Sequence, residues 1–470
     1  PSSIRSKPVT EIRYYAFDRC SYISSIEIPS SVTRIGARAF QGCTQIRSIT
    51  IPRNVSNIGT QAFAGCSLLE AIYVSSQNSH FSSSGGILYN RSKCTLVSCP
   101  PGKKGSVTIP ATVQRLDQGA FGGCERILAV TIPAWLNTIG DGAFSGCESL
   151  LRIDVDPGNL SFESIGGILF TEDRTTLLKC PGGKTGHVTL TTETTTIASG
   201  AFQSCVSIES VELPAGITRI EDYMFSRCTS LGAFTIPDTI TEIGDGAFQY
   251  CSALNGLVIP ASVTSIGNSA FAHCYGLAEI VIANTVTTMG YHVFYVCSGL
   301  LRVTLPDHLT EIGKGWFYRC EKLSEITIPA GVTSIAESAF NICPALTALT
   351  IPDGVTSIGK SAFYRSGLRT ITLPASVTSL EAGVFNSCHD LIEILVAPDN
   401  PAYRSIDGVL YTKDLRTLVQ CPSGKSGPVT VPASVTEVLQ NAFTHCDELN
   451  VVRYMGDAPN FASSGYNDFT

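Results

Sequence analysis

Three similar stretches of seven residues occur in this chain, and the second and third contain Gly-Lys-Thr and Gly-Lys-Ser, the ending of a phosphate-binding loop. They read CPPGKKG at 99–105, CPGGKTG at 180–186 and CPSGKSG at 421–427. A nucleotide-binding loop of the form G-x-x-x-x-G-K-[ST] requires a glycine five positions before the Gly of the Gly-Lys pair, and Leu178 and Val419 occupy those positions. A helix must also follow, so that its N-terminal N–H groups bind the phosphate, whereas a strand-like segment follows here. The repeated segment is therefore predicted to be a structural turn.

The segment DVDPGN at 154–159 alternates acids in the manner of a calcium-binding loop. An EF-hand loop needs glycine at its sixth position and glutamate at its twelfth. Asn159 and Ile165 stand there instead, and the equivalent segments VSSQNS and VAPDNP lack the paired acids. No calcium site is predicted.

Histidine stands beside cysteine at 273–274, 388–389 and 445–446, which suggests zinc. A zinc site needs four ligands that converge on the ion within about 2.0–2.3 Å. These pairs lie far apart in the sequence, and no C-x-x-C or H-x-x-x-H pair accompanies them. The chain also lacks a G-x-S-x-G, H-E-x-x-H or dinucleotide-binding motif. We predict no metal, no cofactor and no catalytic activity.

A period of 23 residues organises the chain, and internal repeats of this length decide the fold. Each copy contains a phenylalanine, and most copies place a cysteine three residues after it. One step is a residue shorter than the others. The phenylalanines are Phe17, Phe40, Phe63, Phe121, Phe144, Phe202, Phe225, Phe248, Phe271, Phe294, Phe317, Phe340, Phe363, Phe385 and Phe443.

One repeat reads CEKLSEITIPAGVTSIAESAFNI, residues 320–342. Ile326 and Ile328 alternate with polar residues, which predicts a short strand with one buried face. Pro329 ends the strand, because proline has no N–H for the ladder. A second apolar pair follows, and a short turn of helix is predicted at 339–340. A glycine often comes after the second pair, where the backbone is expected to turn sharply.

Stacking explains how so short a repeat can be stable. A single copy cannot bury its own apolar side, whereas neighbouring copies bury a continuous core. The chain is 44% hydrophobic and 15% charged, a composition typical of a folded protein. We therefore predict an α/β repeat solenoid that occupies residues 1–470 as a single domain.

Three gaps between phenylalanines are 35 residues longer than one repeat. They predict three inserts of the same kind, at 75–109, 156–190 and 397–431. In each insert GGILYN, GGILFT or DGVLYT precedes TLVSC, TLLKC or TLVQC, which indicates a β-hairpin. The glycine-lysine segment follows the hairpin and is predicted to connect it to the next strand.

The pattern C-x-x-L-x-x-I-x-I-P-x-x-V-x-x-I-G-x-x-A-F resembles the leucine-rich repeats of the BspA-like, or Treponema-type, family. The insert DNPAYRSIDGVLYTKDLRTLVQCPSGKSG and the closing GDAPNF at 456–461 are similar to elements of that family. The resemblance implies a leucine-rich-repeat horseshoe whose short parallel strands form a concave sheet. It also implies a surface or secreted protein of a bacterium or parasitic protist that adheres to host extracellular-matrix proteins such as fibronectin and fibrinogen.

The outward-facing residues of the predicted strands form a candidate binding face. Threonine dominates this column, which suits an exposed strand surface and equally suits a flat platform for an extended protein partner. The candidate residues are Thr235, Val258, Val281, Thr304, Thr327, Thr350 and Thr372, flanked by Arg302, Glu325 and Arg369.

The repeated cysteines are predicted to be buried free thiols, which behave as small hydrophobic groups. Cys94 has no counterpart in the other two inserts, so it is the candidate reactive thiol. Asn-x-Ser sequons make Asn54, Asn90 and Asn159 candidate glycosylation sites if the chain enters a eukaryotic secretory pathway.

The charge of the chain argues against nucleic acid and anionic lipid as main partners. Its net charge is −7, and its lysines and arginines are scattered. No apolar run approaches the ~18–20 residues of a membrane span, and a leader or anchor is expected outside this sequence. We expect a surface-exposed or secreted adhesion module that binds a protein or glycoprotein. The alternative is a structural scaffold, possibly intracellular, with protein partners.

Overall fold

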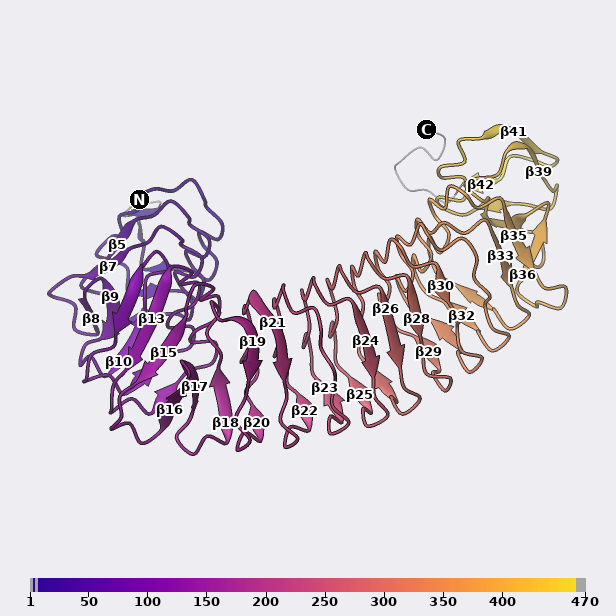
Figure 1. The fold of residues 1–470 in the computed structure, drawn as a ribbon. Helices are drawn as coiled ribbons and strands as arrows, with labels where there is room; N and C mark the ends of the chain where they lie inside the picture. Colours follow the sequence, from indigo (N-terminus) through magenta and orange to yellow (C-terminus); the bar gives the residue numbers. More distant parts are fainter. Residues whose placement is uncertain (1–2, 5–6, 462–470) are drawn as a thin grey trace. The chain divides into compact units, whose positions relative to one another are not determined.

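The computed structural model describes residues 3–4 and 7–461. The chain divides into two compact units, Pro1–Ile217 with Tyr223–Leu231 (unit 1) and Thr218–Asp222 with Gly232–Thr470 (unit 2). Each unit is a stack of short strands in which the backbone coils once per repeat (Figure 1). We call one such coil a rung. The single solenoid over 1–470 and its horseshoe curvature stay predictions.

The first ladder of each unit contains the L-x-x-I-x-I segments. Its strands pair in parallel, and partners are one repeat apart, as in Ser48 beside Ala71. The strands are β5 (Ser48–Ile51), β7 (Ala71–Val74), β11 (Gly105–Thr108), β13 (Ile127–Ile132), β15 (Arg152–Val155), β19 (Thr185–Thr189) and β21 (Ser207–Glu212) in unit 1. In unit 2 they are β24 (Gly256–Ile259), β26 (Glu279–Ile282), β28 (Arg302–Thr304), β30 (Glu325–Ile326), β33 (Thr370–Leu373), β35 (Glu393–Val396), β39 (Gly427–Val431) and β41 (Leu449–Tyr454).

The second ladder contains the second apolar pair of each repeat, again in parallel register, as in Arg34 beside Asn57. In unit 1 its strands are β3 (Glu11–Ile12), β4 (Arg34–Ile35), β6 (Asn57–Ile58), β10 (Thr95–Ser98), β12 (Arg115–Leu116), β14 (Thr138–Ile139), β18 (Thr176–Lys179) and β20 (Thr196–Ile197). In unit 2 they are β22 (Arg219–Ile220), β23 (Glu242–Ile243), β25 (Ser265–Ile266), β27 (Thr288–Met289), β29 (Glu311–Ile312), β31 (Ser334–Ile335), β32 (Ser357–Ile358), β34 (Ser379–Leu380), β38 (Thr417–Gln420), β40 (Glu437–Val438) and β42 (Asn460–Phe461). A further pair, β1 (Ser3–Ile4) and β2 (Lys7–Pro8), is antiparallel.

The segment around each repeated phenylalanine, the phenylalanine turn, is not helical. Alternate N–H groups of the turn donate to the next rung: those of Arg38, Phe40 and Gly42 reach carbonyl oxygens at 3.1, 2.8 and 2.9 Å. Arg38 and Gly42 have φ of 54° and 70°, a left-handed conformation that is incompatible with continued α-helix. The helix turn predicted at 339–340, and with it the helical part of the α/β class, is therefore wrong for the described residues.

The glycines after the second apolar pair are needed for close packing between rungs. Gly59 does not have a positive φ. A Cβ at Gly59 would lie 2.3 Å from the backbone nitrogen of Ala37 in the preceding rung. Contact between rungs, rather than a sharp turn, thus accounts for this glycine.

The core of each unit is a column of stacked phenylalanine rings beside a column of thiols. Phe40 and Phe63 are buried and stack with ring centroids 5.8 Å apart. The Cys66 thiol donates to the Phe40 carbonyl oxygen at 3.0 Å. The buried thiol thus provides a hydrogen bond to a backbone carbonyl group of the preceding rung. The same contact is made at 3.0–3.3 Å by Cys43, Cys147, Cys228, Cys274, Cys297, Cys320, Cys343 and Cys388.

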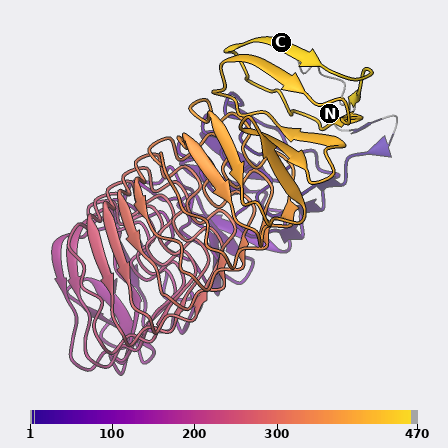
Figure 2. The same ribbon diagram turned by 90° about the vertical axis from the view of Figure 1, so that its right-hand side faces the viewer.

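Each insert supplies a rung of its own. The predicted hairpin forms, and a third strand precedes it, so every insert contains two antiparallel pairings. The last insert strand joins the second ladder in parallel. Figure 2 shows the stacked rungs from the side. The strands that precede it are β8 (Phe81–Ser84) and β9 (Ile87–Asn90), β16 (Phe162–Ile165) and β17 (Ile168–Thr171), and β36 (Tyr403–Ile406) and β37 (Val409–Thr412).

Insert cysteines occupy the place of the phenylalanine. The Cys99 N–H donates to the Ala120 carbonyl oxygen at 2.7 Å, as the Phe40 N–H does to the next rung. The Cys99 carbonyl oxygen in turn accepts from the Cys124 thiol at 3.6 Å. Each insert rung also buries one large aromatic side chain, Tyr89, Phe170 or Tyr411, in the core.

Candidate functional site

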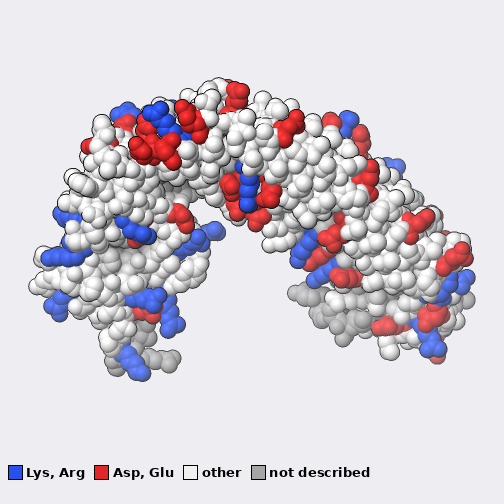
Figure 3. All heavy atoms as spheres, turned by 90° about the horizontal axis from the view of Figure 1, so that it is seen from below, with Lys and Arg blue, Asp and Glu red and all other residues white. Residues whose placement is uncertain are grey.

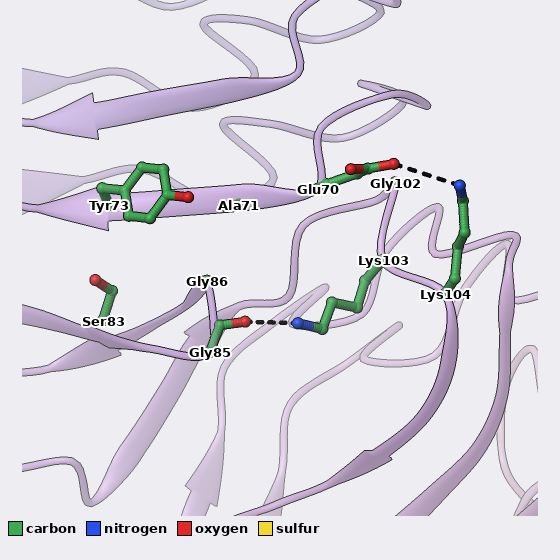
Figure 4. Close-up of a pocket in the computed structure, with 9 residues that line it drawn as sticks. All are labelled: Glu70, Ala71, Tyr73, Ser83, Gly85, Gly86, Gly102, Lys103 and Lys104. Carbon is green, nitrogen blue, oxygen red and sulfur yellow. Dashed lines mark hydrogen bonds and ion pairs between the residues drawn. The ribbon is translucent and has the colours of Figure 1, made fainter.

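The glycine-lysine segments form structural turns, and a strand rather than a helix follows each of them. Every lysine of the Gly-Lys pairs contacts the tip of its own insert hairpin. The Nζ contacts are Lys103 to the Gly85 carbonyl oxygen at 2.5 Å, Lys184 to the Gly166 carbonyl oxygen at 2.6 Å and Lys425 to a carboxylate oxygen of Asp407 at 3.5 Å. Figure 4 shows the first of these contacts. The structural role predicted from the motif spacing is confirmed.

An open groove of about 820 Å³ lies beside the first of these segments (Figure 4). Lys104 Nζ lies 3.4 Å from Glu70 Oε1 on one wall, and Lys103 is bound to Gly85. Both lysines of the groove therefore have partners, and the carboxylate of Glu70 on the same wall disfavours an anion such as phosphate there.

Four residues of the predicted binding face, Val258, Val281, Thr304 and Thr372, lie in strands of the first ladder of unit 2, whereas Thr235, Thr327 and Thr350 lie in segments of the same repeats that are not assigned as strand. The residues of this face point away from the core: Val258 is 65% exposed, Val281 is half-buried and the threonines are exposed. The strand register sets Val281 between Val258 and Thr304. We call Thr235, Val258, Val281, Thr304, Thr327, Thr350 and Thr372 the ladder face.

Charged side chains border the ladder face. Arg302 lies between Glu279 and Glu325 in the strand register, and its Nε lies 3.7 and 3.8 Å from their carboxylate oxygens. All three side chains are at least half exposed. Exposed ion pairs contribute only ~0–1 kcal/mol, so these groups can exchange partners at little cost. Arg369 is also exposed.

Unit 2 also carries an aromatic ridge that the sequence analysis missed. The rings of Tyr250 and His273 stack at 4.3 Å, those of Tyr295 and Tyr318 stack at 4.7 Å, and His273 meets Tyr295 edge to face at 5.6 Å. Partial burial lowers the pKa of His273, which favours its neutral form. The signal was an aromatic or histidine residue one or two positions after the repeated phenylalanine.

Three cysteines, Cys20, Cys94 and Cys446, are partly exposed, and the other fifteen are buried. Hydrogen bonds from the Ser92 hydroxyl at 3.0 Å and the Asn90 amide at 3.1 Å hold the pKa of Cys94 below its ordinary value. Burial raises the pKa of Cys66 and of Cys297 to about 12. These observations support the prediction that Cys94 is the reactive thiol.

The three sequons differ in accessibility. Asn54 is exposed and Asn90 is half-buried. Asn159 is 5% exposed, and its amide makes four hydrogen bonds of 2.8–2.9 Å with the backbone of two rungs. Asn159 is therefore unsuited to glycosylation in the folded chain, because its amide nitrogen is both buried and bonded.

The histidine-cysteine pairs do not assemble a metal site in the described residues. The rings of His389 and His445 lie 5.4 Å apart across the third insert. No group of three or more His, Cys, Asp or Glu side chains converges within residues 3–4 and 7–461. In the same residues, no helix is long and apolar enough to cross a membrane.

Comparison with protein-family models finds the BspA type leucine-rich repeat region, in six copies, over residues 3–99, 102–182, 182–278 and 264–392. The chain belongs to the BspA-type leucine-rich repeat family. Leucine-rich repeat proteins in general bind other proteins.

Solved structures similar to this BspA-type chain include three bacterial leucine-rich repeat proteins. A leucine-rich repeat protein from Eubacterium ventriosum is 24% identical, with 75% of this chain and 85% of that chain covered and a TM-score of 0.48. One from Bacteroides ovatus is 28% identical, with 83% and 82% covered and a TM-score of 0.43. A leucine rich cell surface protein from Faecalibacterium prausnitzii is 22% identical, with 84% and 86% covered and a TM-score of 0.28. Comparison with curated proteins finds no match.

Proposed function

We propose that this chain is a non-catalytic protein-binding module whose ladder face in unit 2 holds an extended segment or flat surface of a protein partner. The observation that carries the proposal is the row of outward side chains Val258, Val281 and Thr304, which the strand register keeps in line, together with the exposed threonines of the neighbouring repeats. Val258 is an apolar side chain that is 65% exposed. Its apolar surface would be removed from water when a partner binds, which favours binding.

The ladder face suits a protein partner for a physical reason. Its backbone is already hydrogen-bonded between rungs, so little conformational entropy is lost when a partner docks. Val258 and Val281 form an apolar centre. Arg302 with its two glutamates forms a charged border, and interfaces commonly combine such a centre with a polar rim.

The finer proposal is that the partner is a host protein outside the producing cell. The family resemblance motivates this choice, with fibronectin and fibrinogen as the first ligands to test, and with the chain at the cell surface or secreted. An intracellular scaffold with protein partners is the alternative. The eighteen free thiols suit that alternative, because thiols stay reduced inside cells.

A solid-phase binding assay with fibronectin, fibrinogen and whole host cells tests the proposal. Val258→Asp places an unpaired charge at the apolar centre of the ladder face and is expected to weaken binding at least tenfold. Ala261→Asp is the matched control, because it adds the same charge to the same rung at an exposed residue off the face. Equal weakening by both variants, or no saturable binding to any ligand, would contradict the proposal.

A further inference from the structure

Unit 1 contains a pocket of about 740 Å³ at the second insert, beside β18 and β20. Its walls are mostly apolar, with Ile139, Phe144, Phe162, Leu169 and Leu178 among the lining side chains. This volume lies within the range of small-molecule sites in proteins, roughly 300–1,000 Å³.

The pocket lies between the phenylalanine turns on either side of the second insert. A side-chain hydrogen bond joins these two turns. The Ser145 hydroxyl donates to Gln203 Oε1 at 3.0 Å across 58 residues of sequence.

At the equivalent position of the first insert the cavity is almost completely filled. The corresponding cavity holds about 40 Å³, because the Gln61 side chain crosses it. Its Cγ would lie 2.8 Å from a Cβ added at Gly119. In the second insert the residue equivalent to Gln61 is Gly142, two positions before the phenylalanine, which has no side chain to fill the gap. The difference between the two cavities therefore follows from particular residues, not from the insert as such.

Lys179 gives the open pocket a positive charge. Its side chain is 8% exposed, and its Nζ donates to the carbonyl oxygens of Gly200 at 3.1 Å and Gln203 at 2.8 Å. An ammonium has three donors, so one remains for a ligand. Among the residues that the structure describes, no carboxylate pairs with this lysine, and the one acid in the lining, Asp141, is solvent-exposed. A desolvated cation without a counter-ion is unfavourable.

We propose that this pocket binds a small organic anion, a carboxylate attached to an apolar body, with the carboxylate on Lys179 and the body against Phe144 and Phe162. The carboxylate would be the counter-ion of Lys179, and one of its oxygens would accept a hydrogen bond from the remaining N–H group of the ammonium. The apolar body would fill the space that Gln61 fills in the first insert. This site lies in unit 1 and is independent of the ladder face.

Isothermal titration calorimetry with sodium decanoate tests the proposal on the full chain. We expect saturable binding at one site per chain, and at least tenfold weaker binding of decan-1-ol and of decyltrimethylammonium, which match the tail but not the charge. Absence of saturable decanoate binding, or equal affinity for decanoate and decan-1-ol, would overturn it.

The chain offers its own variants for the test. Lys179→Gln installs the residue that the third insert has at this place, Gln420, and should weaken decanoate binding at least tenfold. Gly142→Gln copies Gln61, which already tolerates the same left-handed conformation with φ of 55°, and should abolish binding by filling the pocket. Lys184→Gln removes an exposed charge from the same insert and should leave affinity unchanged. Unchanged binding in Lys179→Gln and Gly142→Gln variants that retain the parent's thermal unfolding curve would refute the assignment.

Discussion

At the scale of single residues, the repeated cysteines act as hydrogen-bond donors. In ordinary repeats the buried thiol contacts a carbonyl oxygen of the preceding rung, as Cys66 does with Phe40 at 3.0 Å. Burial raises the pKa of Cys66 to about 12, so almost none of it is thiolate near neutral pH. A thiol in this setting stabilises the stack and is chemically inert.

Cys94 is expected to react first with an alkylating agent. Its hydrogen bonds lower its pKa, so its thiolate fraction exceeds that of an ordinary cysteine at pH 7–8 and rises with pH. Brief treatment with iodoacetamide followed by peptide mass spectrometry should find label on Cys94 well before Cys66, Cys297 or Cys343. Unfolding in urea should remove the difference. Early labelling of a buried cysteine in the folded chain would contradict the prediction.

Phe271→Ala is expected to destabilise unit 2 by about 3–5 kcal/mol, because it removes a buried ring and leaves a cavity. The ring stacks between Phe248 at 5.5 Å and Phe294 at 5.8 Å. Urea unfolding followed by circular dichroism measures the change. Val258→Ala is the control, since an exposed side chain should shift stability by less than about 0.5 kcal/mol.

At the scale of elements, the distance between rungs decides which residues the chain tolerates. At Gly59 an added Cβ would collide with backbone, whereas at Gly256, in β24, the nearest atom would lie 3.9 Å away. Packing between rungs thus requires glycine at position 59 but not at position 256.

Gly59→Ala is expected to destabilise the fold by about 1–3 kcal/mol, because the neighbouring rung must move to admit the methyl group. Gly256→Ala should be neutral or stabilise by up to about 1 kcal/mol, because alanine restricts the unfolded chain more than glycine does. Chemical denaturation of the two variants beside the parent chain gives both values. Similar losses in both would show that packing between rungs is not the cause.

The elements that could be predicted from the sequence are those marked by a repeated pattern of apolar residues. The spacing of isoleucine and valine predicts both ladders. The inserts are predicted because three gaps between the repeated phenylalanines are longer than one repeat by the same number of residues. The phenylalanine turn was mistaken for helix because glycine marks its left-handed positions in only some of the repeats. Arg38, Tyr223, His273 and Ile342 all adopt φ between 54° and 61° there.

The candidate site was predictable only in part, for a related reason. The ladder face follows from strand alternation, so its residues could be named in advance. The pocket of Lys179 depends on contact between rungs 58 residues apart, as in Ser145 with Gln203, and on the absence of one side chain at Gly142. No local pattern reports such a contact.

At the scale of the whole molecule, the stability of each unit rests on stacking rather than on covalent or ionic links. All eighteen cysteines are free. The ion pairs join exposed side chains, most of them at least 40% accessible, and charges of both signs are interspersed on the face in Figure 3. Such pairs contribute little and are screened by salt.

The thermal unfolding midpoint is therefore expected to be unchanged, within about 1 °C, by a reducing agent or by EDTA. Reduction should have no effect because no disulfide constrains the unfolded chain. Differential scanning calorimetry with and without dithiothreitol measures this. A clear drop on reduction would show that disulfides form in the native protein.

Every ordinary rung makes with its successor the same set of backbone hydrogen bonds that it makes with its predecessor. No contact between neighbouring ordinary rungs therefore depends on how many repeats the array contains. Recombination within the gene can therefore add or delete whole repeats and still leave each junction bonded. Related strains are expected to differ in the length of this array, and the ordinary repeats of unit 2, which lie between two inserts, are where such variation would be easiest to accommodate.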